Sequence, residues 1–226
     1  MSDKPAIRTD GLTKSYGDRP ALEPTTLTVA AGERVAIVGH NGSGKTTLMK
    51  MLAGLMDATD GSAFVFGNLA GTSDARRLVS WLSDTPTFYD DLSLDEHLEY
   101  VARLHGVADW QPRADELAAA VGLTERRSDL PTTFSRGLRQ KAAICLALVR
   151  PFKVLLVDEP FVGLDQAGKR VFIDLITRLD ASSTVMIATH ELGFVDRVGR
   201  IIALHDGAIS FDGPSTGVDL EELVRG

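Results

Sequence analysis

Gly39-His40-Asn41-Gly42-Ser43-Gly44-Lys45-Thr46-Thr47 has the G-x-x-x-x-G-K-[ST] spacing of a phosphate-binding loop, and this motif indicates the class of fold. Before it, Arg34 to Val38 is a short apolar run that predicts a buried strand, and after it Thr47 to Leu55 has the apolar spacing of a helix. At such a turn the glycines let backbone N–H groups converge on phosphate oxygens, next to a helix N-terminus. We expect Lys45 to reach the β- and γ-phosphates and the Thr46 hydroxyl to ligate Mg²⁺.

A second pattern is the apolar run Val154 to Val157, which is followed directly by two acids, Asp158 and Glu159. Two acids at the carboxyl end of a buried strand lie where α/β sheets bind ligands. Asp158 is suited to hold Mg²⁺ together with Thr46, and Glu159 to orient or deprotonate the water that attacks the γ-phosphate. A polar turn after a strand is common, but the phosphate-binding loop favours the catalytic interpretation.

The order of apolar patterns predicts an α/β fold with a mainly parallel sheet. We expect residues 7–13 and 27–30 to form an N-terminal antiparallel layer. Further strands are expected at 62–66, 77–84, 154–158 and 184–189, and helices at 166–179 and 191–198. A last pair of strands, 201–204 and 208–211, is expected around the turn Asp206-Gly207. Three helices in succession, 93–106, from Pro112 to Gly122, and 138–150, predict a helical subdomain. We therefore expect one domain over 1–226, with its core at 1–84 and 151–226 and the helical part at about 85–150.

Composition excludes several other classes of protein. The chain of 226 residues is 44% hydrophobic and 24% charged, as in ordinary globular domains. The longest apolar run, Ala142 to Val149, falls well short of the roughly 18 residues of a membrane-spanning helix. The N-terminus lacks the apolar core of a secretory signal, and the single cysteine, Cys145, suits a reducing compartment, so we expect a cytoplasmic protein. A net charge of −7 argues against a general nucleic-acid binder.

Between the two phosphate motifs stands Phe134-Ser135-Arg136-Gly137-Leu138-Arg139-Gln140-Lys141. With this segment in that position, the chain resembles the nucleotide-binding subunit of ATP-binding-cassette (ABC) transporters over almost its full length. Ser135 and Gly137 match the family signature LSGGQ, and the form is similar to the S-[RK]-G-[ML]-R-Q-K variant of ABC-2 type exporters. The resemblance implies a P-loop NTPase fold, ATP hydrolysis, and a dimer in which Ser135 and Gly137 meet the γ-phosphate bound by the opposite subunit. Ser135 is also a good helix N-cap, which is the simpler interpretation of that residue alone.

Other positions match the family one by one. His190 corresponds to the switch histidine that contacts the γ-phosphate, and Tyr16 resembles the aromatic residue that stacks on adenine. Gly163-Leu164-Asp165 resembles the loop that crosses the dimer interface. Asp84 stands where the family has Gln, or sometimes Glu, as an Mg²⁺ sensor, and its carboxylate could still bind the ion or its water.

The resemblance also implies partners: a second ABC ATPase subunit, identical or closely related, and a separate transmembrane permease that would hold the chain at the cytoplasmic face of the membrane. Export is the direction suggested by the signature variant. The segment from Asp84 to Tyr100 has six acids and no Lys or Arg, so it is either the dock for the permease or a solvated helix start.

An alternative function is a soluble ABC ATPase acting on ribosomes or nucleic acid, although such proteins often carry two cassettes or a long coiled coil. A GTPase or small-molecule kinase is disfavoured because we find no [NT]-K-x-D motif.

Overall fold

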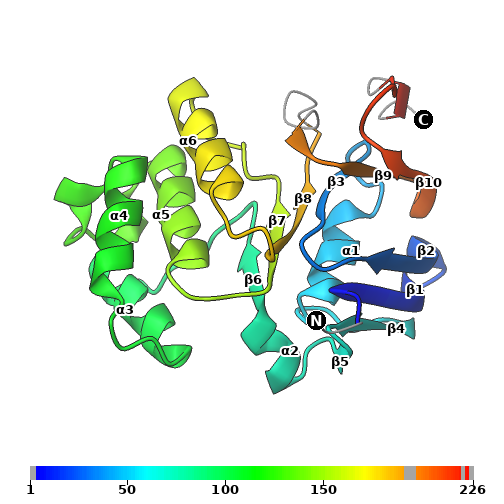
Figure 1. Ribbon diagram of the computed structural model, residues 1–226, viewed down its shortest axis with the longest axis horizontal. Helices are drawn as coiled ribbons and strands as arrows, with labels where there is room; N and C mark the ends of the chain where they lie inside the picture. Colours follow the sequence, from blue (N-terminus) through cyan, green and yellow to red (C-terminus); the bar gives the residue numbers. More distant parts are fainter. Residues whose placement is uncertain (1–3, 191–196, 220–221, 224–226) are drawn as a thin grey trace. The chain divides into compact units, whose positions relative to one another are not determined.

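The computed structural model describes residues 4–190, 197–219 and 222–223, and the chain divides into two compact units (Figure 1). The first unit comprises Met1–Trp81, Phe152–Glu159 and Asp180–Gly226. The second comprises Leu82–Pro151 and Pro160–Leu179. Each unit is therefore built from segments that are distant in the sequence.

One sheet of the first unit is antiparallel and has the order β2-β1-β4-β5. Its strands are β1 (Ile7–Tyr16), β2 (Arg19–Val29), β4 (Asp60–Val65) and β5 (Asn68–Leu69). Ile7 lies opposite both Val29 and Val65, which brings apolar side chains of three strands together. The predicted N-terminal antiparallel layer is confirmed, although β1 and β2 extend further and leave only two residues, Gly17 and Asp18, between them.

The other sheet has the order β10-β9-β3-β8-β7-β6 and is mostly parallel. Its strands are β3 (Arg34–Val38), β6 (Val79–Leu82), β7 (Val154–Asp158), β8 (Thr184–Ala188), β9 (Arg200–His205) and β10 (Ala208–Pro214). Every residue of β7 and β8 is buried. This explains their continuous apolar sequences, because a central parallel strand is covered on both faces. Among the pairings described in this sheet, only that of β9 with β10 is antiparallel, and this hairpin turns at Asp206-Gly207 as predicted.

Helix α1 (Lys45–Leu52) contacts strands of both sheets, and its buried side chains Leu48, Met49 and Leu52 join the core of this unit. Helix α2 (Ser73–Leu78) corrects one prediction, since Arg77 and Leu78 were expected to begin a strand that extended to Asp84. The Thr72 hydroxyl accepts a hydrogen bond from the N–H of Ala75 and starts a helix that lasts to Leu78. The strand β6 is correspondingly short.

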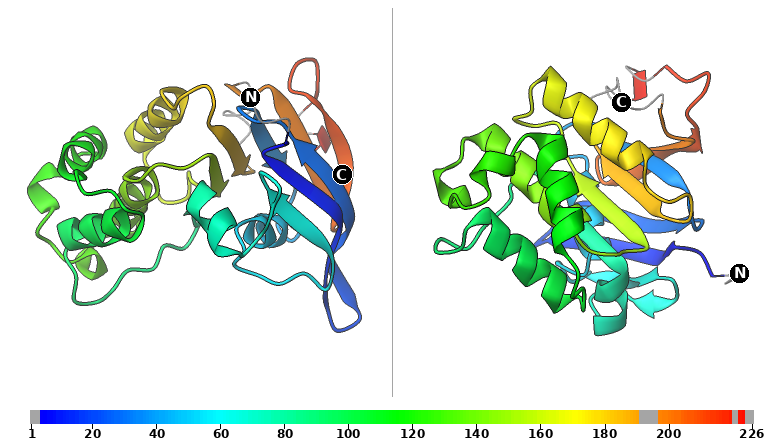
Figure 2. Two further views of the ribbon diagram at one scale, coloured as in Figure 1. Left: turned by 60° about the horizontal axis from the view of Figure 1, so that its bottom comes forward. Right: turned by 60° about the vertical axis from the view of Figure 1, so that its left-hand side comes forward.

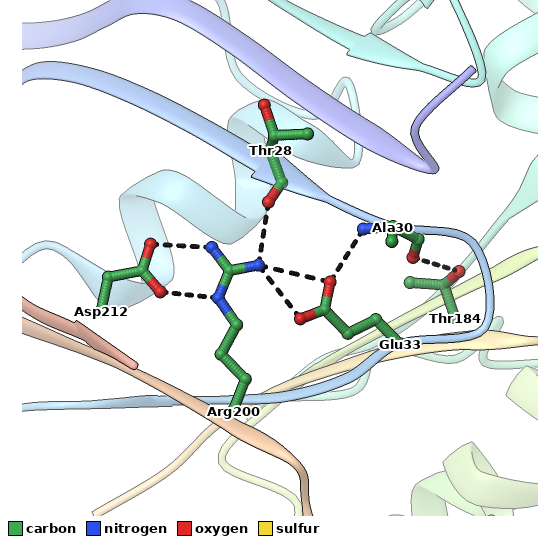
Figure 3. A network of polar contacts seen from close by, with 6 residues as sticks. All are labelled: Thr28, Ala30, Glu33, Thr184, Arg200 and Asp212. Carbon is green, nitrogen blue, oxygen red and sulfur yellow. Dashed lines mark hydrogen bonds and ion pairs between the residues drawn. The ribbon is translucent and has the colours of Figure 1, made fainter. Parts of the chain in front are cut away.

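A network around Arg200 ties the β9–β10 hairpin to the end of β2 (Figure 3). The Arg200 guanidinium binds both carboxylate oxygens of Asp212, at 2.6 and 2.7 Å, and donates to the carbonyl of Thr28 at 2.9 Å. The same group contacts Glu33 at 3.1 Å, and Glu33 accepts from the N–H of Ala30. Hydrogen bonds and ion pairs to Asp212 and Glu33 raise the Arg200 pKa above its ordinary value.

The second unit is helical (Figure 2). It contains α3 (Leu94–Leu104), α4 (Gln111–Val121), α5 (Arg136–Leu148) and α6 (Gln166–Thr177), with short 3-10 turns at Thr124–Arg126 and Pro131–Thr133. The predicted capping box at the start of α3 is confirmed, since the Ser93 and Glu96 side chains each bond the other's backbone N–H. Helix α6 contacts α4 and belongs to this unit, whereas the sequence pattern predicts its residues in the core.

None of the helices that the structure describes is both long and apolar enough to cross a membrane. The single cysteine, Cys145, is buried in α5, and burial raises the pKa of its thiol to about 12. That makes the reactive thiolate form scarce at neutral pH. The short helix that we predicted at 191–198 falls largely on 191–196, which lie outside the described residues.

Candidate active site

Three neighbouring strands, β3, β8 and β7, run parallel and end at the same edge of their sheet. The phosphate-binding loop begins at Gly39, directly after β3, and Asp158 is the last residue of β7. His190 follows β8, separated from it only by Thr189. The carboxyl edge of a parallel sheet is where α/β folds bind ligands. The phosphate-binding loop, Asp158 and His190 therefore all lie at the edge where a ligand is expected.

The loop is shaped by close backbone approaches. A Cβ atom on Gly39, whose φ is +149°, would lie 2.2 Å from the carbonyl oxygen of Leu204. Gly44, with φ 101°, is the N-cap of α1 and leaves no room for a side chain against the carbonyl of Ala21, at 2.7 Å. Asn41 and Gly42 are exposed, and a Cβ on Gly42 would meet no atom within 4 Å. Glycine at 39 and 44 is therefore required by the fold of the loop, and the open side at Gly42 is available to a ligand.

Lys45 folds back over its own loop. Its ammonium donates to the carbonyl oxygens of Gly39 at 2.8 Å and His40 at 3.0 Å, and the residue is only 6% exposed. Burial lowers the Lys45 pKa below 10.5, whereas the negative charges of Glu159 and Asp158 act in the opposite direction. A cation held over a glycine loop in this way is placed to bind phosphate oxygens.

Thr46 and Asp158 form a pair of oxygen donors. The Thr46 hydroxyl donates to Oδ1 of Asp158 at 3.1 Å, and Asp158 is fully buried. A hydroxyl and a carboxylate at this separation are the hard oxygen ligands that Mg²⁺ takes in proteins. The donor set therefore fits the ion that we predicted from the sequence.

Glu159 and His190 form the second pair. The Nδ1 atom of His190 lies 2.8 Å from Oε2 of Glu159, whose own N–H donates to the carbonyl of Ala188 at 2.8 Å. Glu159 has a φ of 45°, a left-handed conformation that is uncommon for a residue with a side chain. Such strain persists only where surrounding contacts enforce it and is concentrated at functional sites. Here the Ala188 contact and the His190 pair hold it.

Four further residues predicted for the site are Tyr16, Ser43, Thr47 and Asp84. Tyr16 ends β1 and is 57% exposed, with the Lys14 ammonium 5.4 Å from the centre of its ring. Thr47 is half-buried in the first turn of α1, and Ser43 is buried in the loop. In the second unit, Asp84 accepts from the Ser83 hydroxyl at 3.1 Å.

The signature segment starts α5, also in the second unit. The Ser135 hydroxyl caps the helix by accepting from the N–H of Leu138 at 3.3 Å. A Cβ on Gly137 would lie 2.7 Å from the carbonyl oxygen of Gly163, so glycine is needed there for packing alone. This contact between the signature segment and the 163–165 loop was not foreseen from the sequence.

Comparisons with known proteins agree with these observations. The family model described as "ABC transporter" matches residues 22–162. The chain belongs to the ABC transporter ATP-binding family. It is an ATPase of the P-loop class, as the sequence predicted.

Three relatives illustrate the range of this ABC ATPase's family. The uncharacterized ABC transporter ATP-binding protein YdbJ of Bacillus subtilis is 35% identical over 96% of this chain and 71% of its own length. The aliphatic sulfonates import ATP-binding protein SsuB 1 of Paracoccus denitrificans is 35% identical over 92% of this chain and 83% of its own. The SkfA peptide export ATP-binding protein SkfE of Bacillus subtilis is 30% identical over 91% and 88%. Importers and exporters are thus both among the relatives.

Solved structures agree on the fold of this ABC ATPase. An ATP-binding subunit of an ABC transporter has a TM-score of 0.89 and 29% identity, and covers 96% of this chain and 97% of its own. A bacterial ABC transporter cassette determined as a dimer has a TM-score of 0.85 and 26% identity, and covers 94% of this chain and 100% of its own. The predicted fold class is therefore confirmed.

Proposed function

We propose that this ABC ATPase hydrolyses ATP in a site formed by two subunits and thereby drives a separate transmembrane permease. The observation that carries the proposal is the pairing of Thr46 with Asp158, at 3.1 Å, and of Glu159 with His190, at 2.8 Å, at one sheet edge beside the phosphate-binding loop. The Thr46–Asp158 pair would supply oxygen ligands for a cation. The Glu159–His190 pair would supply a base and the residue that orients it. Phosphoryl transfer to water needs both.

Each residue would have a distinct role. Lys45 and the loop N–H groups from Gly39 to Thr47 would bind the phosphates, and Tyr16 would stack on adenine. Thr46 and Asp158 would hold Mg²⁺, which would neutralise charge on the phosphates. A role of Asp84 as a further Mg²⁺ ligand stays a prediction from the family resemblance. Glu159 would accept a proton from the attacking water. His190 would orient Glu159 and contact the γ-phosphate.

Completion of the site by a second subunit follows from the signature segment. The start of α5 presents N–H groups and a positive helix dipole that suit an anion. Ser135 and Gly137 would meet the γ-phosphate bound by a partner subunit, identical to this chain or closely related. A solved relative of the same fold is a dimeric cassette, which supports this arrangement.

The surface around the start of α3 is our candidate for the permease dock. Of its six acids, Asp95 pairs with Arg127, Glu99 with Arg103, and Glu96 closes the capping box. Asp90 and Asp91 are exposed, and neither forms an ion pair with another residue that the structure describes. Two exposed aromatic rings, Tyr89 and Tyr100, lie beside them with centroids 5.6 Å apart.

His97 stabilises this surface from beneath. Its Nδ1–H donates to the carbonyl of Ser93 at 2.7 Å, and its Nε2 accepts from the N–H of Tyr89 at 2.9 Å. Only the neutral imidazole satisfies both bonds. A basic, amphipathic loop of a membrane subunit is the partner that such an acidic, aromatic surface fits. Binding there would place the ATPase at the cytoplasmic face of the membrane.

Export is our proposal for the direction of transport, on the basis of the Phe134 to Lys141 variant. The named relatives do not choose a direction, since they include both an importer and an exporter.

The test of the proposed function is to isolate the ATPase from its native membranes and identify what accompanies it. Recovery with a hydrophobic polypeptide that stimulates its ATP hydrolysis is expected. Recovery with ribosomes or nucleic acid, and stimulation by them, would instead favour the soluble class.

A further inference from the structure

We propose that His40, His205 and Asp206 form a binding site for a divalent transition-metal ion of the zinc type, separate from the Mg²⁺ ligands. His40 is the second residue of the phosphate-binding loop, His205 ends β9, and Asp206 is the first residue of the β9–β10 turn. One potential ligand atom from each residue lies within 4.8 Å of the other two. All three belong to the first unit.

The distances are compatible with a metal ion bound between the three side chains. Nε2 of His40 lies 3.5 Å from Oδ1 of Asp206, and Nε2 of His205 lies 3.5 Å from Oδ2. A hydrogen bond between a charged imidazole and a carboxylate is shorter, about 2.7–2.9 Å. Two ligands bound at about 2.0–2.1 Å to one tetrahedral zinc ion are about 3.3 Å apart, close to what is seen here.

The tautomer of His40 supports the same conclusion. Its Nδ1 lies 2.9 Å from the carbonyl oxygen of Asn41, which can only accept, so Nδ1 carries the hydrogen. In the neutral ring the lone pair is then on Nε2, the atom that faces Asp206. Metal-bound histidines commonly donate their other N–H to a carbonyl in this way. A lone pair facing a carboxylate is repulsive, and a cation bound between them, or a proton on Nε2, removes that repulsion.

The conformation of the turn presents the third ligand. Asp206 has a φ of 46° and Gly207 a φ of 83°, as in a two-residue hairpin turn that places both central residues in the left-handed region. The imidazoles of His40 and His205 meet edge to face, with centroids 5.1 Å apart. Two imidazole nitrogens and one carboxylate oxygen form a three-ligand set that leaves a fourth position for water.

A bound ion would brace the phosphate-binding loop. The β9–β10 turn already holds this loop through its backbone, because the N–H of Gly207 donates to the carbonyl of Ser43 at 3.1 Å. The packing of Gly39 against the Leu204 carbonyl adds a second contact. A metal ion would add a side-chain link between His40 and the same turn.

The test is titration of the full chain, without nucleotide, with Zn²⁺ by calorimetry and with Co²⁺ by visible absorption. Excess Mg²⁺ is present to occupy oxygen-ligand sites, since it does not compete well for imidazole nitrogen. We expect one ion per chain, with the strong absorption of four-coordinate Co²⁺. His205→Ala and Asp206→Asn should each weaken binding at least tenfold, as loss of a ligand requires.

Two matched variants control for other histidines: His105→Ala removes an imidazole from the second unit, and His190→Ala removes the one beside Glu159. Both should bind the ion as the wild type does. The proposal is overturned if the wild type binds no Co²⁺, or if His205→Ala and Asp206→Asn retain its affinity. Asp206→Asn keeps the shape of the residue and tolerates the left-handed turn, so it remains informative even if His205→Ala misfolds.

Discussion

Nδ1 of His190 lies 2.8 Å from Oε2 of Glu159, and this contact joins the end of β7 to the residue that follows β8. The carboxylate is largely covered while the imidazole is half-exposed, with side-chain exposures of 15% and 50%. Glu159 is therefore oriented by its neighbour, and His190 still has a face open to a ligand. This is the arrangement expected of a base and its positioning partner.

Replacing Glu159 by Gln should abolish most hydrolysis without abolishing ATP binding. The amide has the same shape but cannot take a proton, and a general base contributes about 10²–10⁴-fold to the rate. Phosphate release measures turnover, filter binding measures affinity, and gel filtration with ATP should reveal a trapped dimer. Glu125→Gln, an exposed acid-to-amide change, is the matched control. Unchanged steady-state turnover in Glu159→Gln would refute the assignment of Glu159.

Replacing His190 by Ala should lower the maximal rate by about 10²-fold, the scale for loss of one hydrogen-bonding group that acts in the transition state. His190→Gln can still donate to Glu159 and should recover part of the rate. The comparison of kcat with KM for the two variants is the measurement. Equal rates for Ala and Gln would mean that the hydrogen bond to Glu159 contributes nothing.

Lys45→Met should remove the stabilisation that ATP gives to the folded chain. A ligand at about 100 times its Kd stabilises by about 2.7 kcal/mol, and Lys45 is the buried cation of the loop. Thermal unfolding with and without ATP measures this shift, with Lys50→Met in the same helix as the control. An ATP-induced shift equal to that of the wild type would contradict the role of Lys45.

The same variant has a pH signature without nucleotide. Burial lowers the Lys45 pKa below 10.5, so the folded chain releases this proton before the unfolded chain does. Between the folded-state pKa and 10.5 the unfolded chain binds more protons, and wild-type stability should therefore rise with pH relative to Lys45→Met. Urea unfolding across alkaline pH measures the difference, and a fall in that window would contradict the shift.

Arg200→Met should destabilise the first unit by about 1–3 kcal/mol, because Asp212 and Glu33 would lose a shared, partly buried cation. Arg200→Lys keeps the charge but not the two-pronged contact with Asp212 and should recover only part of the loss. Urea unfolding measures both variants. Arg103→Met breaks an exposed pair with Glu99 and should cost less than about 0.5 kcal/mol. Equal losses at the two sites would show that the network adds nothing.

Charge reversal at Asp90 and Asp91 to Lys should weaken association with the permease and make it less sensitive to salt. Both acids are exposed, so the ATPase activity of the isolated chain should not change. Co-purification from membranes at two salt concentrations provides the measurement. Reversal of Asp115 and Glu116, exposed acids of α4, is the control. If both double variants bind the permease as the wild type does, the acidic surface is not the dock.

Much of this protein could be determined from its sequence alone, because the decisive signals are local. The Gly39 to Thr47 loop, the acids after β7, the cap at Ser93 and the turn at Asp206-Gly207 each depend on a few consecutive residues. Their backbone conformations are dictated by glycine, by capping side chains and by apolar runs. These segments adopt the predicted elements, and the fold class follows from their order.

The contacts between segments that are distant in the sequence became known only from the three-dimensional structure. In the structure Arg77 and Leu78 end helix α2, α6 packs with α4, and Gly163 lies against Gly137. The structure also brings Arg200 to Glu33 and His205 to His40, pairs whose members are separated by more than 160 residues. Local periodicity carries no information on such approaches, since they depend on how whole sheets and helices pack. The phosphate-binding loop and the turn at Asp206-Gly207 could therefore each be predicted from the sequence, whereas the contact between them could not.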